Sequence, residues 1–137
     1  MAGQIIIVQK KITLNYSNLA ASTTYEYVHA LAINVVHARE IIVNARVSQR
    51  NTVAGTQAGL FVRGVYPDPE DGGDIVGADL TGLAINLLTA PTTVPGIATA
   101  TQVNNIPAWI RIGTRFGQPV TPVSLIITLA IEIVVRE

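Results

Sequence analysis

Apolar and polar residues alternate with a period of two along most of this chain, which is the pattern of half-buried β-strands. From Ile41 to Val47 every odd position is apolar, whereas the even positions are mostly polar. The alternation is longest from Val123 to Val135, where the odd positions are all aliphatic and the even positions are half apolar. We therefore expect this last segment to be a central strand, or a strand whose second face a neighbour covers.

Five more segments follow the same pattern and are rich in β-branched residues, so we expect about seven or eight strands and no helix. Polar stretches that contain Gly or Pro separate these segments and predict connections. Between two long strands, His37–Arg39 contains neither Gly nor Pro, which indicates a bulge or a tight corner instead of a hairpin loop. The five segments are Gln4–Tyr16, Thr24–Val36, Leu60–Tyr66, Leu83–Leu88 and Ala108–Phe116, and the main connections are Asn51–Gly59, Pro67–Gly77 and Thr89–Pro107.

These elements predict a single all-β domain over residues 1–137, built as a two-sheet antiparallel β-sandwich. Long strand regions near both ends, with five segments between them, favour a jelly-roll-like topology. An immunoglobulin-like sandwich is the alternative, although the chain has no Cys and therefore lacks the Cys…Trp…Cys pattern of that fold. A chain of this length can bury a hydrophobic core without disulfides or metals.

Charged residues are scarce, at 13% of the chain against about 25% in a typical soluble domain. Nine basic residues balance nine acidic ones, so the chain lacks the basic field that non-specific nucleic-acid binding needs. Because the cores of protein interfaces are depleted of charge, we favour a surface that neighbouring subunits cover over one coated with uncharged polar residues. No membrane span is expected, since Val123–Val135 is shorter than the ~20 residues of a spanning helix. The start of the chain does not match a signal peptide.

An acidic turn is the sharpest local feature, because five of the nine acidic residues fall between positions 68 and 79. Calcium binds to several oxygen ligands, which flexible Asp-rich loops supply. The spacing resembles an EF-hand loop only loosely, since Gly72 occupies a ligand position and no flanking helices are expected. We therefore favour a solvated turn and no metal, and we keep a weak candidate calcium site at Asp68, Glu70, Asp74 and Asp79.

We predict that millimolar calcium leaves the melting temperature of the protein unchanged, because a solvated turn gains nothing from the cation. Thermal unfolding with and without calcium checks this. A rise of several degrees would instead show that the folded state binds calcium.

Arginine makes up seven of the nine basic residues, which suits bidentate pairing with carboxylates within the chain or between subunits. Several arginines share the polar faces of predicted strands. The long Pro-containing connection Thr89–Pro107 is a second candidate for subunit contact, because structureless segments of that length are usually functional. The interface candidates from these two features are Arg46, Arg50, Arg111, Arg115, Thr92, Val94, Pro95 and Ile97.

We expect no enzyme, no catalytic residues and no cofactor. The two histidines, His29 and His37, lie about 26 Å apart on an extended strand and cannot share a metal there. No P-loop, G-x-S-x-G elbow or H-E-x-x-H motif occurs. An aromatic platform for sugars is possible, but Tyr25 and Tyr27 share a face with aliphatic residues, and we assign them and Trp109 to the core.

Four stretches show the Cys-free, Ala-, Thr-, Val- and Ile-rich character of the chain: MAGQIII, AREIIVNARVSQR, GLFVRGVYPDPEDGG and TAPTTVPG. In this overall style the chain resembles the head-decoration and other minor structural proteins of tailed bacteriophages. Such proteins often form trimers on capsid lattices. The resemblance therefore implies a homo-oligomer, with a trimer favoured, that contacts a major capsid or other virion protein. It implies a virion location after assembly in the host cytoplasm, and it assigns no role to single residues.

The leading hypothesis is a structural virion subunit, of the decoration, cement or minor capsid type, that self-associates and packs on a protein lattice. It requires no membrane, no cofactor and no direct contact with nucleic acid. A carbohydrate- or receptor-binding β-sandwich module is the alternative, and a small hydrolase is the third reading. Exposed aromatic residues would favour the alternative, whereas a broad aliphatic surface would favour a structural subunit.

Overall fold

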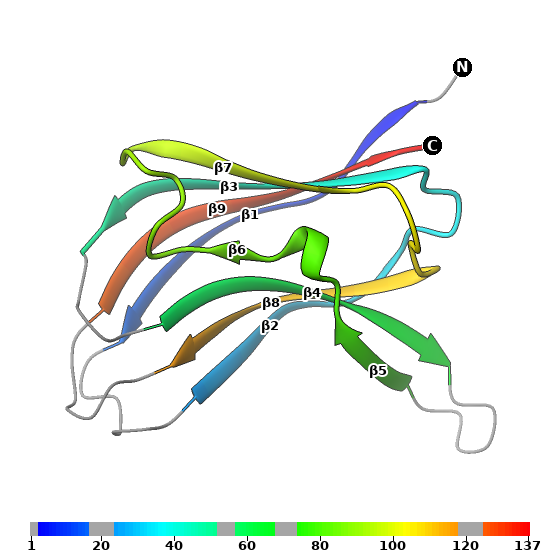
Figure 1. Ribbon diagram of the computed structural model, residues 1–137, viewed down its shortest axis with the longest axis horizontal. Helices are drawn as coiled ribbons and strands as arrows, with labels where there is room; N and C mark the ends of the chain where they lie inside the picture. Colours follow the sequence, from blue (N-terminus) through cyan, green and yellow to red (C-terminus); the bar gives the residue numbers. More distant parts are fainter. Residues whose placement is uncertain (1–2, 17–23, 52–56, 68–73, 118–124) are drawn as a thin grey trace.

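The computed structural model describes residues 3–16, 24–51, 57–67, 74–117 and 125–137 (Figure 1). These residues form nine strands and one short 3-10 turn, arranged as two antiparallel sheets packed face to face. Among them, no helix is long and apolar enough to cross a membrane. Sheet A contains, in spatial order, β1 (Gln4–Tyr16), β9 (Leu125–Arg136), β3 (Glu40–Arg50) and β7 (Gly96–Gln102). Sheet B contains β2 (Thr24–Asn34), β8 (Trp109–Gly117), β4 (Gln57–Pro67) and β5 (Asp74–Asp79), and β6 (Ile85–Asn86) also pairs with β4.

The strands pair in a nested order that characterises a jelly roll. The first strand pairs with the last, β2 with β8, β3 with β7 and β4 with β5, all antiparallel. When this ribbon of paired strands rolls up, β9 also pairs with β3 and β8 with β4, which completes the two sheets. The predicted jelly-roll-like sandwich is confirmed. In the immunoglobulin-like alternative the first two strands share a sheet, whereas here β1 and β2 lie in different sheets.

Aliphatic side chains from both sheets fill the space between them. The odd-numbered residues of β9 from Ile127 to Val135 are at most 1% exposed, as are those of β3 from Ile41 to Val47. The period-two pattern therefore identified the buried face of both strands correctly. Because β9 lies between β1 and β3, the expectation of a central C-terminal strand is also confirmed. Sheet B and the residues on either side of β6 complete the core with Leu60, Val62, Ile110, Ile112, Leu83, Ile85 and Leu87.

The junction between β2 and β3 is a tight corner, as its lack of Gly and Pro predicts. The amide of Ala38 donates to the carbonyl of Val35 at 2.9 Å, which closes a turn. Since β2 belongs to sheet B and β3 to sheet A, this turn carries the chain from one sheet to the other.

Two connections predicted from the sequence contain strands. β7 lies within the Thr89–Pro107 segment, and β5 begins inside the Pro67–Gly77 turn region. Both strands alternate small or polar residues with few large aliphatic ones, so their periodicity is weak. The reverse error occurs at Leu83–Leu88, where only Ile85–Asn86 is a strand and a 3-10 turn (Thr81–Leu83) precedes it. Thr89–Pro107 is therefore not one long structureless segment.

We predict that Leu129→Asp abolishes folding, because Leu129 is 1% exposed and an unpaired charge in the core costs far more than an ordinary substitution. Val36→Asp is the matched control, since Val36 is 55% exposed at the corner after β2. Circular dichroism and thermal melting check both variants. A folded, cooperatively melting Leu129→Asp protein would contradict the assignment of the inner face.

Candidate functional site

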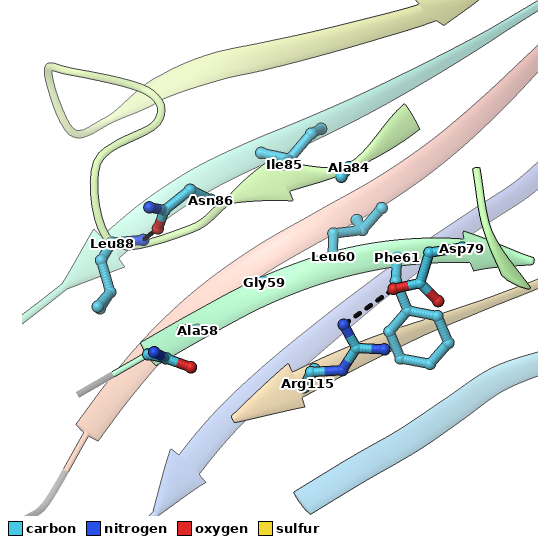
Figure 2. Close-up of a pocket in the computed structure, with 11 residues that line it drawn as sticks. Ala58, Gly59, Leu60, Phe61, Asp79, Ala84, Ile85, Asn86, Leu88 and Arg115 are labelled. Atoms are coloured by element: carbon cyan, nitrogen blue, oxygen red, sulfur yellow. Dashed lines mark hydrogen bonds and ion pairs between the residues drawn. The ribbon is translucent and has the colours of Figure 1, made fainter. Parts of the chain in front are cut away.

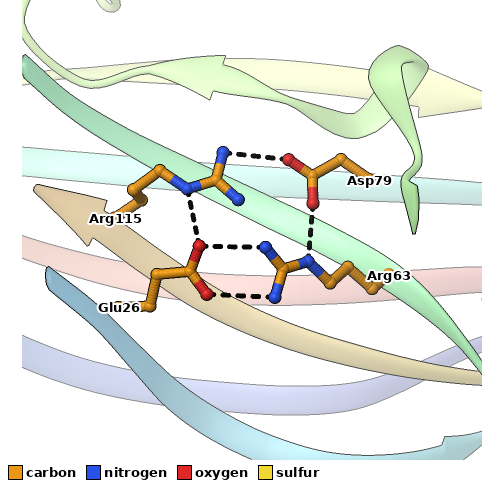
Figure 3. A network of polar contacts seen from close by, with 4 residues as sticks. All are labelled: Glu26, Arg63, Asp79 and Arg115. Atoms are coloured by element: carbon orange, nitrogen blue, oxygen red, sulfur yellow. Dashed lines mark hydrogen bonds and ion pairs between the residues drawn. The ribbon is translucent and has the colours of Figure 1, made fainter. Parts of the chain in front are cut away.

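Four charged side chains form a ring on the outer face of sheet B (Figure 3). Each of the four main strands contributes one member: Glu26 on β2, Arg115 on β8, Arg63 on β4 and Asp79 at the end of β5. The strand register brings the four residues together, because Glu26 lies opposite Arg115 and Asp79 lies opposite Arg63. We call this set the charged ring.

The two arginines of the charged ring bridge the two carboxylates in a closed cycle. Arg63 donates from Nη1 and Nη2 to Glu26 at 3.0 and 2.9 Å, and from Nε to Asp79 Oδ1 at 2.6 Å. Arg115 donates from Nε to Glu26 Oε1 and from Nη1 to Asp79 Oδ2, both at 2.9 Å. All four carboxylate oxygens therefore accept charge-assisted hydrogen bonds, and the ring is electrically neutral.

The charged ring covers the aromatic side chain of Phe61. The guanidinium carbons of Arg63 and Arg115 lie 4.4 and 5.0 Å from the centroid of this side chain, within the range of cation–π attraction. Phe61 is only 2% exposed, although it alternates along β4 with the core residues Leu60 and Val62. Opposite Phe61 is Gly113, where a Cβ atom would lie 2.6 Å from the aromatic side chain. The absence of a side chain at position 113 therefore makes room for Phe61.

Each member of the charged ring is stabilised in its ionised form. Hydrogen bonds from Arg63 lower the pKa of Glu26, against the opposing effect of partial burial. Partial burial acts to raise the pKa of Asp79, but hydrogen bonds from Arg115 and Arg63 outweigh it and leave that pKa lowered. The pKa of Arg63 is raised chiefly by Glu26, and the pKa of Arg115 chiefly by Asp79. Carboxylates that are paired in this way are poor proton acceptors near neutral pH, so the geometry suits a clamp between strands better than acid–base chemistry.

A cavity of about 360 Å³ adjoins the charged ring where β6 flanks β4 (Figure 2). Asp79 and Arg115 form part of its wall together with Asn86, while Ile85 and Leu88 supply apolar surface. This volume lies at the lower end of the range for small-molecule sites.

The arginines that the sequence analysis selected have different environments. Arg115 belongs to the charged ring. Arg50 donates to the carbonyls of Leu87 and Pro91 at 3.1 and 2.8 Å, and so ties the chain after β6 to β3. Arg46 is exposed on sheet A, and Arg111 is half-buried on β8, in register with Arg63 of the ring.

The remaining interface candidates lie in β7 or just before it. Thr92 and Pro95 are exposed, Ile97 is 54% exposed, and Val94 is half-buried against the core. Arg46, Pro95 and Ile97 line a shallow hollow of about 310 Å³ at this border of sheet A. The structure thus brings Arg46 near the Pro-containing segment and separates both from Arg115, which lies in sheet B.

The acidic residues considered for calcium do not share one environment. Both carboxylate oxygens of Asp79 accept hydrogen bonds in the charged ring. Asp74 opens β5 opposite Pro67, while Asp68 and Glu70 lie outside the described residues. Within the described part of the chain, no group of three or more acidic or His residues could hold a metal ion.

The assignment of Tyr27 and Trp109 to the core is wrong, because these side chains are 43% and 40% exposed. Trp109 starts β8 opposite Val65, next to Tyr66, which is 48% exposed. Trp109 precedes the core residue Ile110 and lies on the outer face of sheet B, the same face as Arg115. His29 is half-buried, and its Nε2 lies 2.9 Å from Thr114 Oγ1.

The sequence predicts Arg115 as a candidate residue, but it does not predict the partner Glu26 or the buried Phe61. One signal was available, since Phe61 and Arg63 are two residues apart and must share a face of their strand. Glu26 gives no such signal, because its place beside Arg115 depends on a strand register that spans 89 residues.

No family model matches this chain, and no curated protein matches it. Among solved structures, the chain is similar to one described under the words "Bacillus endospore appendages form a novel family of disulfide-linked pili". The identity is 14%, the alignment covers 97% of this chain and 89% of that chain, and the TM-score is 0.31. A likeness of this strength carries no functional argument.

We predict that the charged ring makes stability depend on acidic pH. The folded-state pKa values of Glu26 and Asp79 lie below their ordinary values of 4.5 and 3.8, so their contribution is complete above about pH 5 and is lost as pH falls through the lowered values. Glu26→Gln should therefore lower the free energy of unfolding by about 1 kcal/mol at pH 7, since the ring is partly screened by solvent. The deficit should shrink at pH 3.

Urea titrations at both pH values check this prediction. Glu137→Gln is the control, because Glu137 is exposed and lies outside the charged ring. An equal deficit for Glu26→Gln at pH 7 and pH 3 would contradict a stabilising role for the ionised carboxylate.

Proposed function

We propose that this chain is a structural subunit that self-associates and packs on a protein lattice, as a phage decoration, cement or minor capsid protein does. The observation that carries the proposal is the low charge on the outer face of β9, β3 and β7, three neighbouring strands of sheet A. Between the ends of the strands, β3, β7 and β9 contain two ionisable residues, Arg46 and Glu132.

The polar groups on this face are engaged with one another across three strands. Asn44 donates to Glu132 at 3.1 Å and accepts from the Thr99 hydroxyl at 2.8 Å. Around this row the face presents small and aliphatic residues, among them Ile42, Ile97 and Ala130. Removing water from this surface costs little free energy, because it has few charges and because its amide and carboxylate are already paired with each other.

Composition supports the same reading. Only 13% of the residues are charged, and the charged ring on sheet B uses four of them in a neutral cluster. Net charge close to zero lets copies of a protein approach without mutual repulsion. Jelly rolls occur in viral capsid proteins and also in lectins and cupins, so the fold permits this function without selecting it.

The proposed partners are copies of the same chain and a major capsid or other virion protein, and the proposed location is the virion. The resemblance to phage decoration proteins implies a trimer. Neither a cofactor nor direct contact with nucleic acid is part of the proposal, since the chain is neutral overall.

A carbohydrate- or receptor-binding module is the second candidate, and the exposed aromatic residues favour it. Trp109 and Tyr66 lie at the same end of sheet B, and both are at least 40% exposed. Sugar rings stack on aromatic faces. Trp109 is paired with Val65, and Tyr66 follows Val65, so the two side chains point to opposite faces of the sheet and each would have to bind a sugar separately.

We predict that the purified chain forms an oligomer whose mass is a multiple of 14.5 kDa and increases with concentration. Size exclusion coupled to light scattering measures this mass. Wild-type protein that stays a monomer up to millimolar concentration would contradict self-association.

The fluorescence of Trp109, the one Trp in the sequence, separates the two candidates. A sugar that stacks on Trp109 should shift its emission, and Trp109→Ala should remove glycan binding while leaving the oligomer intact. For a structural subunit, a panel of glycans should leave the emission of the wild-type protein unchanged.

A further inference from the structure

Each sheet of the sandwich has two border strands, and the four borders differ in how well they are protected. A border strand exposes backbone N–H and C=O groups that can pair with another chain. Proteins prevent such pairing with charged residues, prolines, bulges or very short border strands. The borders are β1 and β7 in sheet A, and β2 and the β5/β6 side in sheet B.

Three of the borders carry such protection. β1 contains Lys10 and Lys11 and has a register shift between Ile6 and Val8. β2 contains Glu26 and has two register shifts against β8. On the remaining side, β6 has two residues, whereas β5 starts and ends with Asp and pairs with β4 through another shift.

β7 has none of these devices. Its seven residues pair with β3 in unbroken register, from Gly96 opposite Val47 to Gln102 opposite Ile41. The strand contains neither a charged residue nor a proline, and Ile97, Thr99 and Thr101 are exposed. Among the described residues, no residue of β7 makes a backbone hydrogen bond outside the sheets. The 3-10 turn lies beside the far end of this border, where a Cβ on Gly82 would be 3.5 Å from the Thr101 carbonyl oxygen. No backbone hydrogen bond outside the sheets occupies the border among the described residues, which leaves it available to an additional strand (top of Figure 1).

We infer that β7 pairs antiparallel with β7 of a second copy of the chain, across a two-fold axis at Thr99. This inference rests on the proposed self-association and names its interface. Full overlap of the two strands places Ala98 opposite Ala100 of the second copy and Ile97 opposite Thr101 of the second copy. Thr99 then faces itself, and Thr–Thr pairs are favourable cross-strand neighbours. The two four-stranded sheets become one continuous sheet.

The protection of the other borders is the reason for a two-fold contact. A head-to-tail contact would join β7 to a different border of the next copy, where lysines, register shifts or a very short strand oppose pairing. β7 matches itself because its pattern reads similarly in both directions around Thr99. A two-fold contact makes the dimer the basic unit, in contrast with the trimer that the phage resemblance implies.

Opposite charges at position 99 test this contact directly. In the paired strands the two side chains at position 99 would have Cβ atoms about 5 Å apart, so Thr99→Lys or Thr99→Glu places like charges together. Each variant alone should weaken dimerisation at least about tenfold at low salt, and an equimolar mixture should restore the dimer. Light scattering on the single variants and on the mixture measures this.

Ser48→Lys is the matched control. Ser48 is exposed on β3, on the same outer face as Thr99, and its hydroxyl also makes one hydrogen bond within the sheet. This variant should dimerise like the wild type. Thermal melts should show that all three variants remain folded.

The results of these experiments distinguish an error in the proposed β7 contact from an error in the proposed self-association. If wild-type and both Thr99 variants associate equally, or if the wild-type mass is that of a trimer, the β7 contact is wrong and self-association stands. If both variants are monomers but their mixture is not a dimer, Thr99 does not face itself and the two-fold pairing is wrong. A wild-type protein that never associates overturns the proposed function and the contact together.

Discussion

The position of β9 between β1 and β3 is the constraint on which sheet A depends. Both neighbours reach β9 from the other half of the chain, and they pair with it along most of its length. The side chains of β9 that face sheet B, from Ile127 to Val135, are at most 1% exposed, as deeply buried as the matching row of β3. Because the outer pairs of a jelly roll enclose the inner ones, correct pairing of the ends also positions β3 against β7 and β2 against β8.

The two sheets arrange their charged residues differently. On sheet B, Glu26, Arg63, Asp79 and Arg115 neutralise one another above Phe61, which would otherwise be an exposed apolar side chain. On sheet A the polar row through Asn44 leaves most of the surface uncharged. Away from the strand ends, β9, β3 and β7 contain only Glu132 and Arg46 as charged residues, and this is the part of sheet A that we propose meets other subunits.

The sequence predicted the fold class and the buried faces of the long strands, because large aliphatic residues at every second position leave few alternatives. It did not predict β7, where Ala98 and Ala100 face the core and supply too little apolar contrast to Thr99. The charged ring was beyond prediction for a different reason. Arg63 and Arg115 are visible as arginines on strands, but their partners depend on registers between segments far apart in the chain.

The nested pairing also bears on how the protein is made. Gln4 lies opposite Arg136, so the first strand leaves the ribosome long before its partner has been synthesised. Sheet A can form only after β9 has emerged, and until then the apolar faces of β1 and β3 have no complete sheet to join. Topologies dominated by such distant pairings fold slowly and expose their strands for longer. The nested pairing therefore lengthens the time during which the apolar strands of the growing chain are exposed.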